Sequence, residues 1–191
     1  AAELLLFAVL IVAVRGTAQA AIFFGGQSIS AAILAATLIG ILALAEAPVI
    51  ISGGIDLSIG SLIAVSSVAG AYFMTSTLDG VPVPIPVGFL VALLVGAGLG
   101  LVNGCLIVFV RIPPFVATLG MMIAARGIAQ MVSGGLTISS LPSPLGKAAL
   151  QRIEVLGVGV HVTVLVFIAA AAVLLVLLRF TVFGRHCFAI G

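Results

Sequence analysis

The polar side chains that could do chemistry in this chain are few, and most lie inside or beside long apolar stretches. The segment from Ser52 to Ser61 reads Ser-Gly-Gly-Ile-Asp-Leu-Ser-Ile-Gly-Ser, and apolar sequence long enough to cross a bilayer flanks it on both sides. Charge next to hydrocarbon is costly, which makes Asp56 and Ser58 candidates for contact with a transported solute at a helix break. The alternative is structural, with Asp56 capping the following helix by accepting N–H groups of its first turn.

Glycine and proline residues around this carboxylate predict a departure from regular helix. Gly53, Gly54 and Gly60 permit a sharp or left-handed backbone. Pro48 lacks a backbone donor and predicts a kink near the end of the preceding helix. Glu46 lies close to that kink, and its carboxylate is predicted either to line a solute path or to pair structurally.

Two further polar residues lie within apolar stretches. The amide of Asn103 must find a partner in the membrane, either in an interhelical hydrogen bond or on a solute path. Arg126 lies well inside a predicted span, where its guanidinium is expected to pair with a carboxylate such as Asp56 or Glu46, or to take part in transport or its coupling.

A row of glycines on the same span as Asn103 predicts close helix packing. Gly96, Gly100 and Gly104 recur every four residues and therefore share one helix face, where small residues let another helix approach. A dinucleotide-binding fingerprint is excluded, because that motif follows a strand in a soluble unit.

Catalytic and metal chemistry find no support in the residue pattern. The two histidines and two cysteines show no metal-ligand spacing, and the sequence has no phosphate-binding loop. We therefore expect no cofactor, no metal and no enzyme activity, including no ATP hydrolysis by this chain. A clustered basic face is also missing, which argues against a nucleic-acid partner.

Composition places these residues in a membrane protein. The chain has 191 residues, of which 63% are hydrophobic and only 6% charged, far from the balance of a soluble domain. Continuous apolar runs favour helices over barrel strands, so we expect an all-α polytopic bundle forming a single transmembrane domain over residues 1–191. Six spans are predicted, at Leu4–Phe24, Ser30–Ile51, Leu57–Ser76, Pro86–Val110, Phe115–Val132 and Val158–Phe180.

The connections between these spans carry turn and loop residues. Pro113 and Pro114 predict the start of the fifth span, where the missing N–H costs nothing. Residues Ser133–Gly157 form the longest polar connection and are expected outside the membrane. Positive charge does not orient the chain, since Arg111, Arg179 and Arg185 are balanced by Lys147, Arg152 and Arg15.

Several segments together resemble the membrane permease subunit of ribose- and xylose-type bacterial ATP-binding-cassette importers. The segments begin at Val49-Ile-Ile-Ser-Gly-Gly-Ile-Asp-Leu-Ser-Ile-Gly-Ser61 and Gly100-Leu-Val-Asn-Gly104. They continue with Arg111-Ile-Pro-Pro-Phe-Val-Ala-Thr-Leu-Gly-Met122, Ala125-Arg-Gly127, Ser133-Gly-Gly135, Phe183-Gly-Arg185 and Ala189-Ile-Gly191. Order and spacing match along about residues 30–191.

The resemblance implies a function in the bacterial inner membrane. Such permeases form a multi-pass path for a monosaccharide, pair as homodimers or heterodimers, receive sugar from a periplasmic binding protein and dock on a separate ATPase subunit. Members have about ten spans, so we expect this chain to be the amino-terminal part of a larger permease. That topology places Arg111, Arg179 and Arg185 in the cytoplasm and Ser133–Gly157 in the periplasm.

Two departures from the family pattern leave the solute open. Glu46 and Pro48 stand where relatives usually have neither a charge nor a proline. Alternatives are a permease for branched-chain amino acids or nucleosides, an ion-coupled carrier in which Glu46, Asp56 and Arg126 relay charge, and a structural membrane fragment without transport.

Overall fold

Long apolar helices dominate the computed structural model, which describes residues 9, 25–78, 80–155 and 158–191. Four of them are long and apolar enough to cross a membrane, in agreement with a polytopic helical bundle. They are α3 (Gly26–Ile51), α5 (Ile85–Val108), α6 (Pro114–Ser133) and α8 (Thr163–Phe180). The first predicted span, residues 4–24, lies outside the described residues except for Val9.

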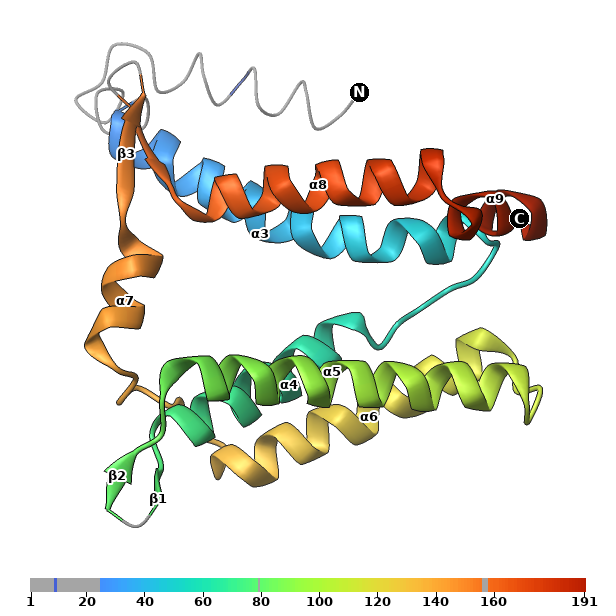
Figure 1. Ribbon diagram of the computed structural model, residues 1–191, viewed down its shortest axis with the longest axis horizontal. Coiled ribbons are helices and arrows are strands. Elements are labelled where there is room, and N and C mark those ends of the chain that lie inside the picture. Colours follow the sequence, from blue (N-terminus) through green and yellow to red (C-terminus); the bar gives the residue numbers. More distant parts are fainter. Residues whose placement is uncertain (1–8, 10–24, 79, 156–157) are drawn as a thin grey trace.

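The helices form two layers (Figure 1). One layer holds α3 and α8 with the short α9 (Val182–Ile190), and the other holds α4 (Ile59–Met74), α5 and α6. Within the second layer α4 packs against both α5 and α6. Residues 52–58, which we call the break segment, join the layers near one end, and α7 (Ser143–Leu150) joins them at the other.

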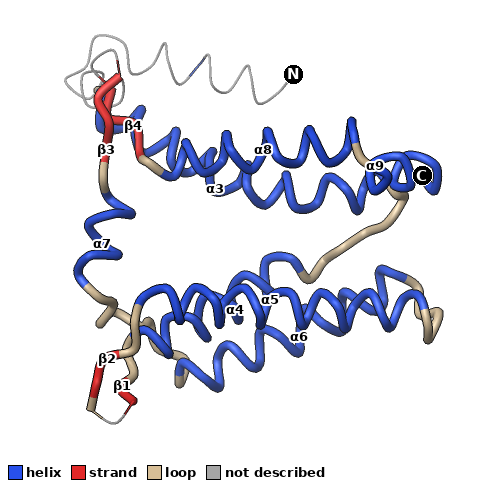
Figure 2. Tube along the Cα trace, in the orientation of Figure 1, coloured by secondary structure: helices blue, strands red, loops and turns tan. Residues whose placement is uncertain are grey.

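Two predicted spans are shorter in the structure. The third is α4, whose 16 residues rise about 24 Å, less than the ~30 Å hydrocarbon core. The sixth begins only at Thr163, because residues 158–161 are a strand and not the start of a span. This strand, β4 (Val158–His161), pairs antiparallel with β3 (Arg152–Val155), with Arg152 opposite His161. A smaller hairpin of β1 (Thr77–Leu78) and β2 (Val81–Pro82) lies at the same end of the molecule (Figure 2).

Local sequence explains where α6 begins and ends. Pro113 is the N-cap and Pro114 the first helical residue, as the two prolines predict. At the other end Gly134 adopts a left-handed conformation with φ of 63°, and its N–H bonds to Met131 O at 3.4 Å. Glycine tolerates this backbone without steric cost, so the helix ends there.

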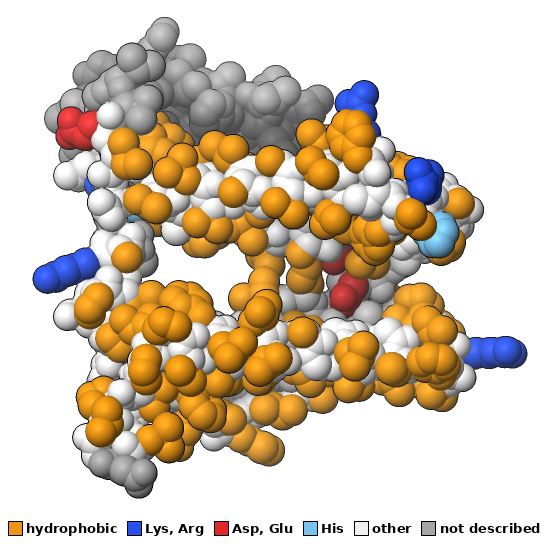
Figure 3. Space-filling model, viewed as in Figure 1, with side chains coloured by type: hydrophobic (Ala, Val, Ile, Leu, Met, Phe, Trp, Pro, Cys, Tyr) orange, Lys and Arg blue, Asp and Glu red, His pale blue; other side chains and the backbone are white. Residues whose placement is uncertain are grey.

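Most of the Lys and Arg side chains visible in Figure 3 lie toward the two ends of the bundle, while acidic atoms also appear between the two layers. Arg111 follows α5, while Arg179 and Arg185 lie at the end of α8 and in α9, all at the end where α9 lies. Lys147 in α7 and Arg152 in β3 lie at the opposite end. Arg15 is outside the described residues. The three arginines therefore lie at one end of the bundle, and their position on the cytoplasmic side stays a prediction.

Small residues bring α4 and α5 together. A Cβ at Gly70 would lie 2.8 Å from the Gly88 carbonyl oxygen, and one at Gly96 would lie 2.9 Å from Ser66 Oγ. Gly100 and Gly104 have nothing within 4 Å among the described residues, so the predicted close approach occurs only at Gly96 of that row. Beyond these contacts most large apolar side chains are exposed, as expected for helices that face lipid.

Candidate functional site

The candidate site is built around the break segment. Helix α3 continues through Pro48 to Ile51, and the chain then turns through Gly53, whose φ is 73°. The turn is closed by Gly53 N–H to Ile50 O at 3.0 Å and Gly54 N–H to Val49 O at 2.9 Å. The left-handed conformation predicted from the glycines is therefore found at Gly53, while Gly60 lies inside α4 with open space around it.

Asp56 fixes the end of the break segment through Ser58. Its Oδ1 accepts the Ser58 N–H at 2.7 Å and the Ser58 hydroxyl at 2.6 Å. The first turn of α4 instead uses the Ser58 carbonyl, which accepts from Ser61 N–H and Leu62 N–H. Asp56 therefore holds Ser58, the residue before α4, and does not cap the first turn of the helix itself. An aspartate side chain that accepts the backbone N–H two residues later forms a common local turn.

Side chains from two other helices anchor the same segment. Asn103 in α5, only 5% exposed, donates from Nδ2 to Ser58 Oγ at 2.9 Å. Thr118 in α6 lies with its Oγ1 3.4 Å from Ile55 O, besides a bond of 2.8 Å to Pro114 O. The interhelical bond expected of Asn103 is present, and its partner belongs to the break segment. Thr118 was not singled out by its sequence; its one signal is a polar residue within an apolar helix.

Glu46 joins α3 to the break segment. Its Oε1 accepts the Asp56 N–H at 3.3 Å, while Oε2 is buried without a hydrogen-bond partner. Asn103 Oδ1 is likewise buried and unpartnered. Two buried acceptor atoms without donors are expensive in a protein interior. Neither Glu46 nor Asn103 lines the cavity described next.

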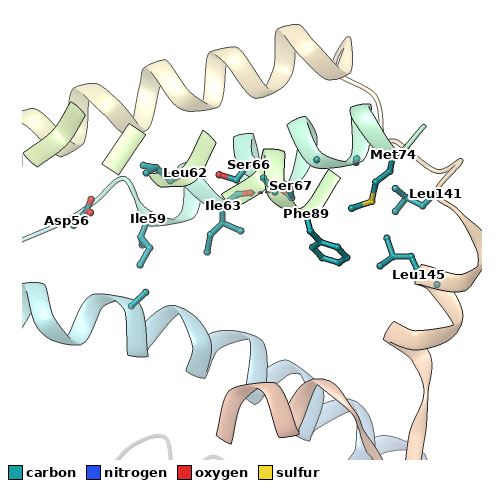
Figure 4. A pocket seen from close by; sticks show the side chains of 16 residues that line it. Asp56, Ile59, Leu62, Ile63, Ser66, Ser67, Met74, Phe89, Leu141 and Leu145 are labelled. Atoms are coloured by element: carbon teal, nitrogen blue, oxygen red, sulfur yellow. Dashed lines mark hydrogen bonds between the residues drawn. The ribbon is translucent and has the colours of Figure 1, made fainter. Parts of the chain in front are cut away.

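A cavity of about 770 Å³ runs from the break segment along α4 to α7 (Figure 4). Its size suits a small-molecule site. Most of the lining is apolar, including Ile63, Phe89 and Leu145, and the polar exceptions are Asp56, Ser66 and Ser67. Ser66 Oγ is a third buried polar atom without a partner, and the sequence alone did not single it out. Asp56 thus lies where a polar break meets an otherwise apolar cavity.

Arg126 does not belong to this constellation. It is exposed on α6, beside Gln130, in a shallow pocket lined by residues of α6 alone. Within the described part of the chain it forms no ion pair with Glu46 or Asp56, which contact each other instead. The structure brings together Glu46, Asp56, Ser58 and Asn103, and it leaves Arg126 apart.

The arrangement offers hydrogen bonds and no reacting groups. No set of three or more His, Cys, Asp or Glu side chains is placed to hold a metal ion in the described residues. Carboxylates, hydroxyls and one amide surround the break, and these groups bind polar solutes reversibly.

Comparisons with known proteins place the chain among transport proteins. Residues 28–191 match the family described as branched-chain amino acid transport system / permease component. Similar relatives include the Autoinducer 2 import system permease protein LsrD of Escherichia coli (strain K12), Escherichia coli O157:H7 and Shigella flexneri. Each is 35% identical over 158 residues, which cover 80% of this chain and 46% of the relative. The chain therefore spans about half the length of these relatives. No solved structure matches it.

Proposed function

Since the chain belongs to the family of permease components of branched-chain amino acid transport systems, we propose that it lines the solute path of an ATP-driven importer for a ribose- or xylose-like monosaccharide. As a member of this family it is a multi-pass inner-membrane transport component, not an enzyme. The path candidates are Glu46, Asp56, Ser58 and Asn103 around the break, with Arg126 on a separate face.

The observation that carries the proposal is the position of the break. Asp56 lies at the end of the cavity, held by Ser58 while α3, α5 and α6 contribute contacts to the segment. Irregular backbone at membrane depth is tolerated where it is buried in protein or lines a water-filled cavity. Transporters use broken helices to present backbone groups to their solutes.

A monosaccharide fits the chemistry of the site. Its hydroxyls are hydrogen-bond donors, and the polar side chains that line the cavity, Asp56, Ser66 and Ser67, can accept from them. The apolar cavity wall leaves only a few polar contacts along the path. Few contacts favour release after binding, which transport requires as much as entry does.

The proposed assembly follows the two ends of the bundle. The end with Arg111, Arg179 and Arg185 would face the cytoplasm and an ATP-binding-cassette ATPase. The end with α7 and the two hairpins would face the periplasm and a sugar-binding protein. A second permease chain, identical or related, would complete the membrane unit.

Two other solute classes rest on specific findings. The relatives are named as permeases of an autoinducer 2 import system, which makes autoinducer 2 a candidate solute. The family description favours branched-chain amino acids. Nucleosides, the other alternative raised from the sequence, have no finding in their favour. An ion-coupled relay through Glu46, Asp56 and Arg126 is disfavoured, since Arg126 lies apart from the two carboxylates.

Uptake into proteoliposomes tests the proposal. The permease is reconstituted with its ATPase and binding protein, and uptake of ribose, xylose, autoinducer 2, leucine and a nucleoside is measured with ATP or with a proton gradient alone. We expect uptake of ribose or xylose that requires both ATP and the binding protein. Uptake driven by the proton gradient without ATP contradicts the importer, and selective uptake of another solute replaces the sugar assignment.

A further inference from the structure

One face of α6 carries a charge that nothing in the described residues neutralises. The side of α6 with Ala117, Thr118, Ala125 and Ala129 is buried, and α4 packs against it. The opposite side, which we call the α6 outer face, consists of Gly120, Ile123, Arg126, Gly127 and Gln130. Arg126 is exposed there, without an ion pair in the described part of the chain.

The depth of Arg126 makes exposure to lipid costly. The 20 residues of α6 rise about 30 Å, which matches the hydrocarbon core. Arg126 lies roughly 18 Å from the first residue of α6 and about 10 Å from its last. Helical side chains lean toward the helix N-terminus, so the guanidinium points toward the middle of the membrane and away from the nearer surface. A charge at that depth is normally paired or faces water.

The residues around Arg126 favour a protein partner over water. Polar side chains on the outer face are confined to Arg126 and Gln130, one turn apart, and the preceding turn presents Met122 and Ile123. A water-filled path calls for polar groups along more of the helix. Gly120 and Gly127 have no described atom within 4 Å of a Cβ position, so another helix can approach closely there.

Charge identifies the chemistry of that helix. A guanidinium in a dry interface is matched best by a carboxylate, with which it forms two parallel hydrogen bonds. Among the described residues Glu46 accepts the Asp56 backbone N–H, the Asp56 carboxylate accepts from Ser58, and Glu154 lies in the β3 strand. The other two acidic residues, Glu3 and Asp79, lie outside the described residues. The described carboxylates therefore leave Arg126 unmatched, and we assign its partner to a helix outside the described residues; the relatives, of which this chain covers 46%, have length for further helices.

We propose that the α6 outer face is the docking surface for a transmembrane helix that carries one carboxylate at the depth of Arg126. Gly120 and Gly127 set the close approach, and Arg126 with Gln130 supplies the polar contact. This assignment concerns assembly within the membrane and does not depend on the solute.

Model transmembrane peptides test the assignment directly. Three leucine- and alanine-rich peptides of one length carry Glu, Gln or Leu at the depth of Arg126, and their association with the chain in vesicles is followed by energy transfer from a donor on the exposed Cys105. We expect the Glu peptide to bind about tenfold more tightly than the Leu peptide, a factor typical of a polar contact between membrane helices. Arg126→Leu removes this difference, and Arg126→Lys keeps part of it.

Matched variants separate charge, packing and water. Arg179→Leu, an exposed arginine at the end of α8, leaves the preference for the Glu peptide unchanged. Gly127→Leu weakens binding of every peptide because it blocks close approach. Equal binding of the three peptides to the wild-type chain overturns the proposal without requiring any variant. Labelling of Gln130→Cys by a membrane-impermeant maleimide as fast as Gly80→Cys, both in a Cys105→Ala background, overturns it as well by showing a water-lined face.

Discussion

Replacing Ser58 by alanine tests whether hydrogen bonds hold the break segment in place. The Ser58 hydroxyl is fully buried, donates to Asp56 Oδ1 at 2.6 Å and accepts from Asn103 Nδ2 at 2.9 Å. A bond to a carboxylate contributes about 1.5 kcal/mol or more, and an interhelical bond in a membrane about 0.6 kcal/mol. Ser58→Ala should therefore lower the free energy of unfolding by about 2 kcal/mol.

The control lies on the same helix. Ser67 is exposed on α4, and its hydroxyl bonds only to carbonyls of its own helix, at 2.7 Å to Ile63 O and 3.0 Å to Ala64 O. Ser67→Ala should change stability by less than about 0.5 kcal/mol. Unfolding is followed by far-UV circular dichroism in detergent with added SDS, since the chain has no tryptophan. A value for Ser58→Ala within about 0.5 kcal/mol of Ser67→Ala refutes the reasoning.

Three further predictions follow from the same geometry. Glu46→Ala removes the acceptor of the Asp56 N–H and should speed proteolysis of the break segment, whereas Glu46→Gln keeps an acceptor and should not. Equal proteolysis rates for the two variants contradict the contact. Gly53→Ala, at φ of 73°, should cost about 1 kcal/mol in SDS unfolding, while Gly60→Ala should be neutral or stabilising. Gly88→Ala pushes against α4 and should cost about 1–3 kcal/mol, in contrast to Gly98→Ala, which meets open space; equal melting temperatures argue against the packing.

Hydropathy predicted the positions of most of the membrane helices, but it did not predict every helix boundary. Helices α3, α5 and α6 match predicted spans within about four residues at each end. The start of the sixth span was wrong, because Val158–His161 is as apolar as a helix start and its strand character depends on pairing with Arg152–Val155. No local pattern in either segment reveals that pairing.

The sequence predicted which residues belong to the site better than it predicted which of them contact each other. The motif around Asp56 pointed to the break, and the polar character of Asn103 required a partner. That this partner is Ser58, 45 residues away, follows from the packing of α4 on α5, which spacing cannot supply. The same holds for Glu46, which was a candidate partner of Arg126 and instead accepts the backbone N–H of Asp56.

ATP-dependent uptake by an Asp56→Asn permease tests the central claim most directly. The substitution keeps an oxygen that accepts from Ser58 while it removes the negative charge at the end of the cavity. Assembly with the ATPase is measured in the same vesicles, and Gly98→Ala, where an added methyl group meets open space, is the control. The account predicts that uptake falls at least about tenfold with normal assembly, while the control transports like the wild type. Unchanged uptake by Asp56→Asn contradicts a role for the break segment in the solute path.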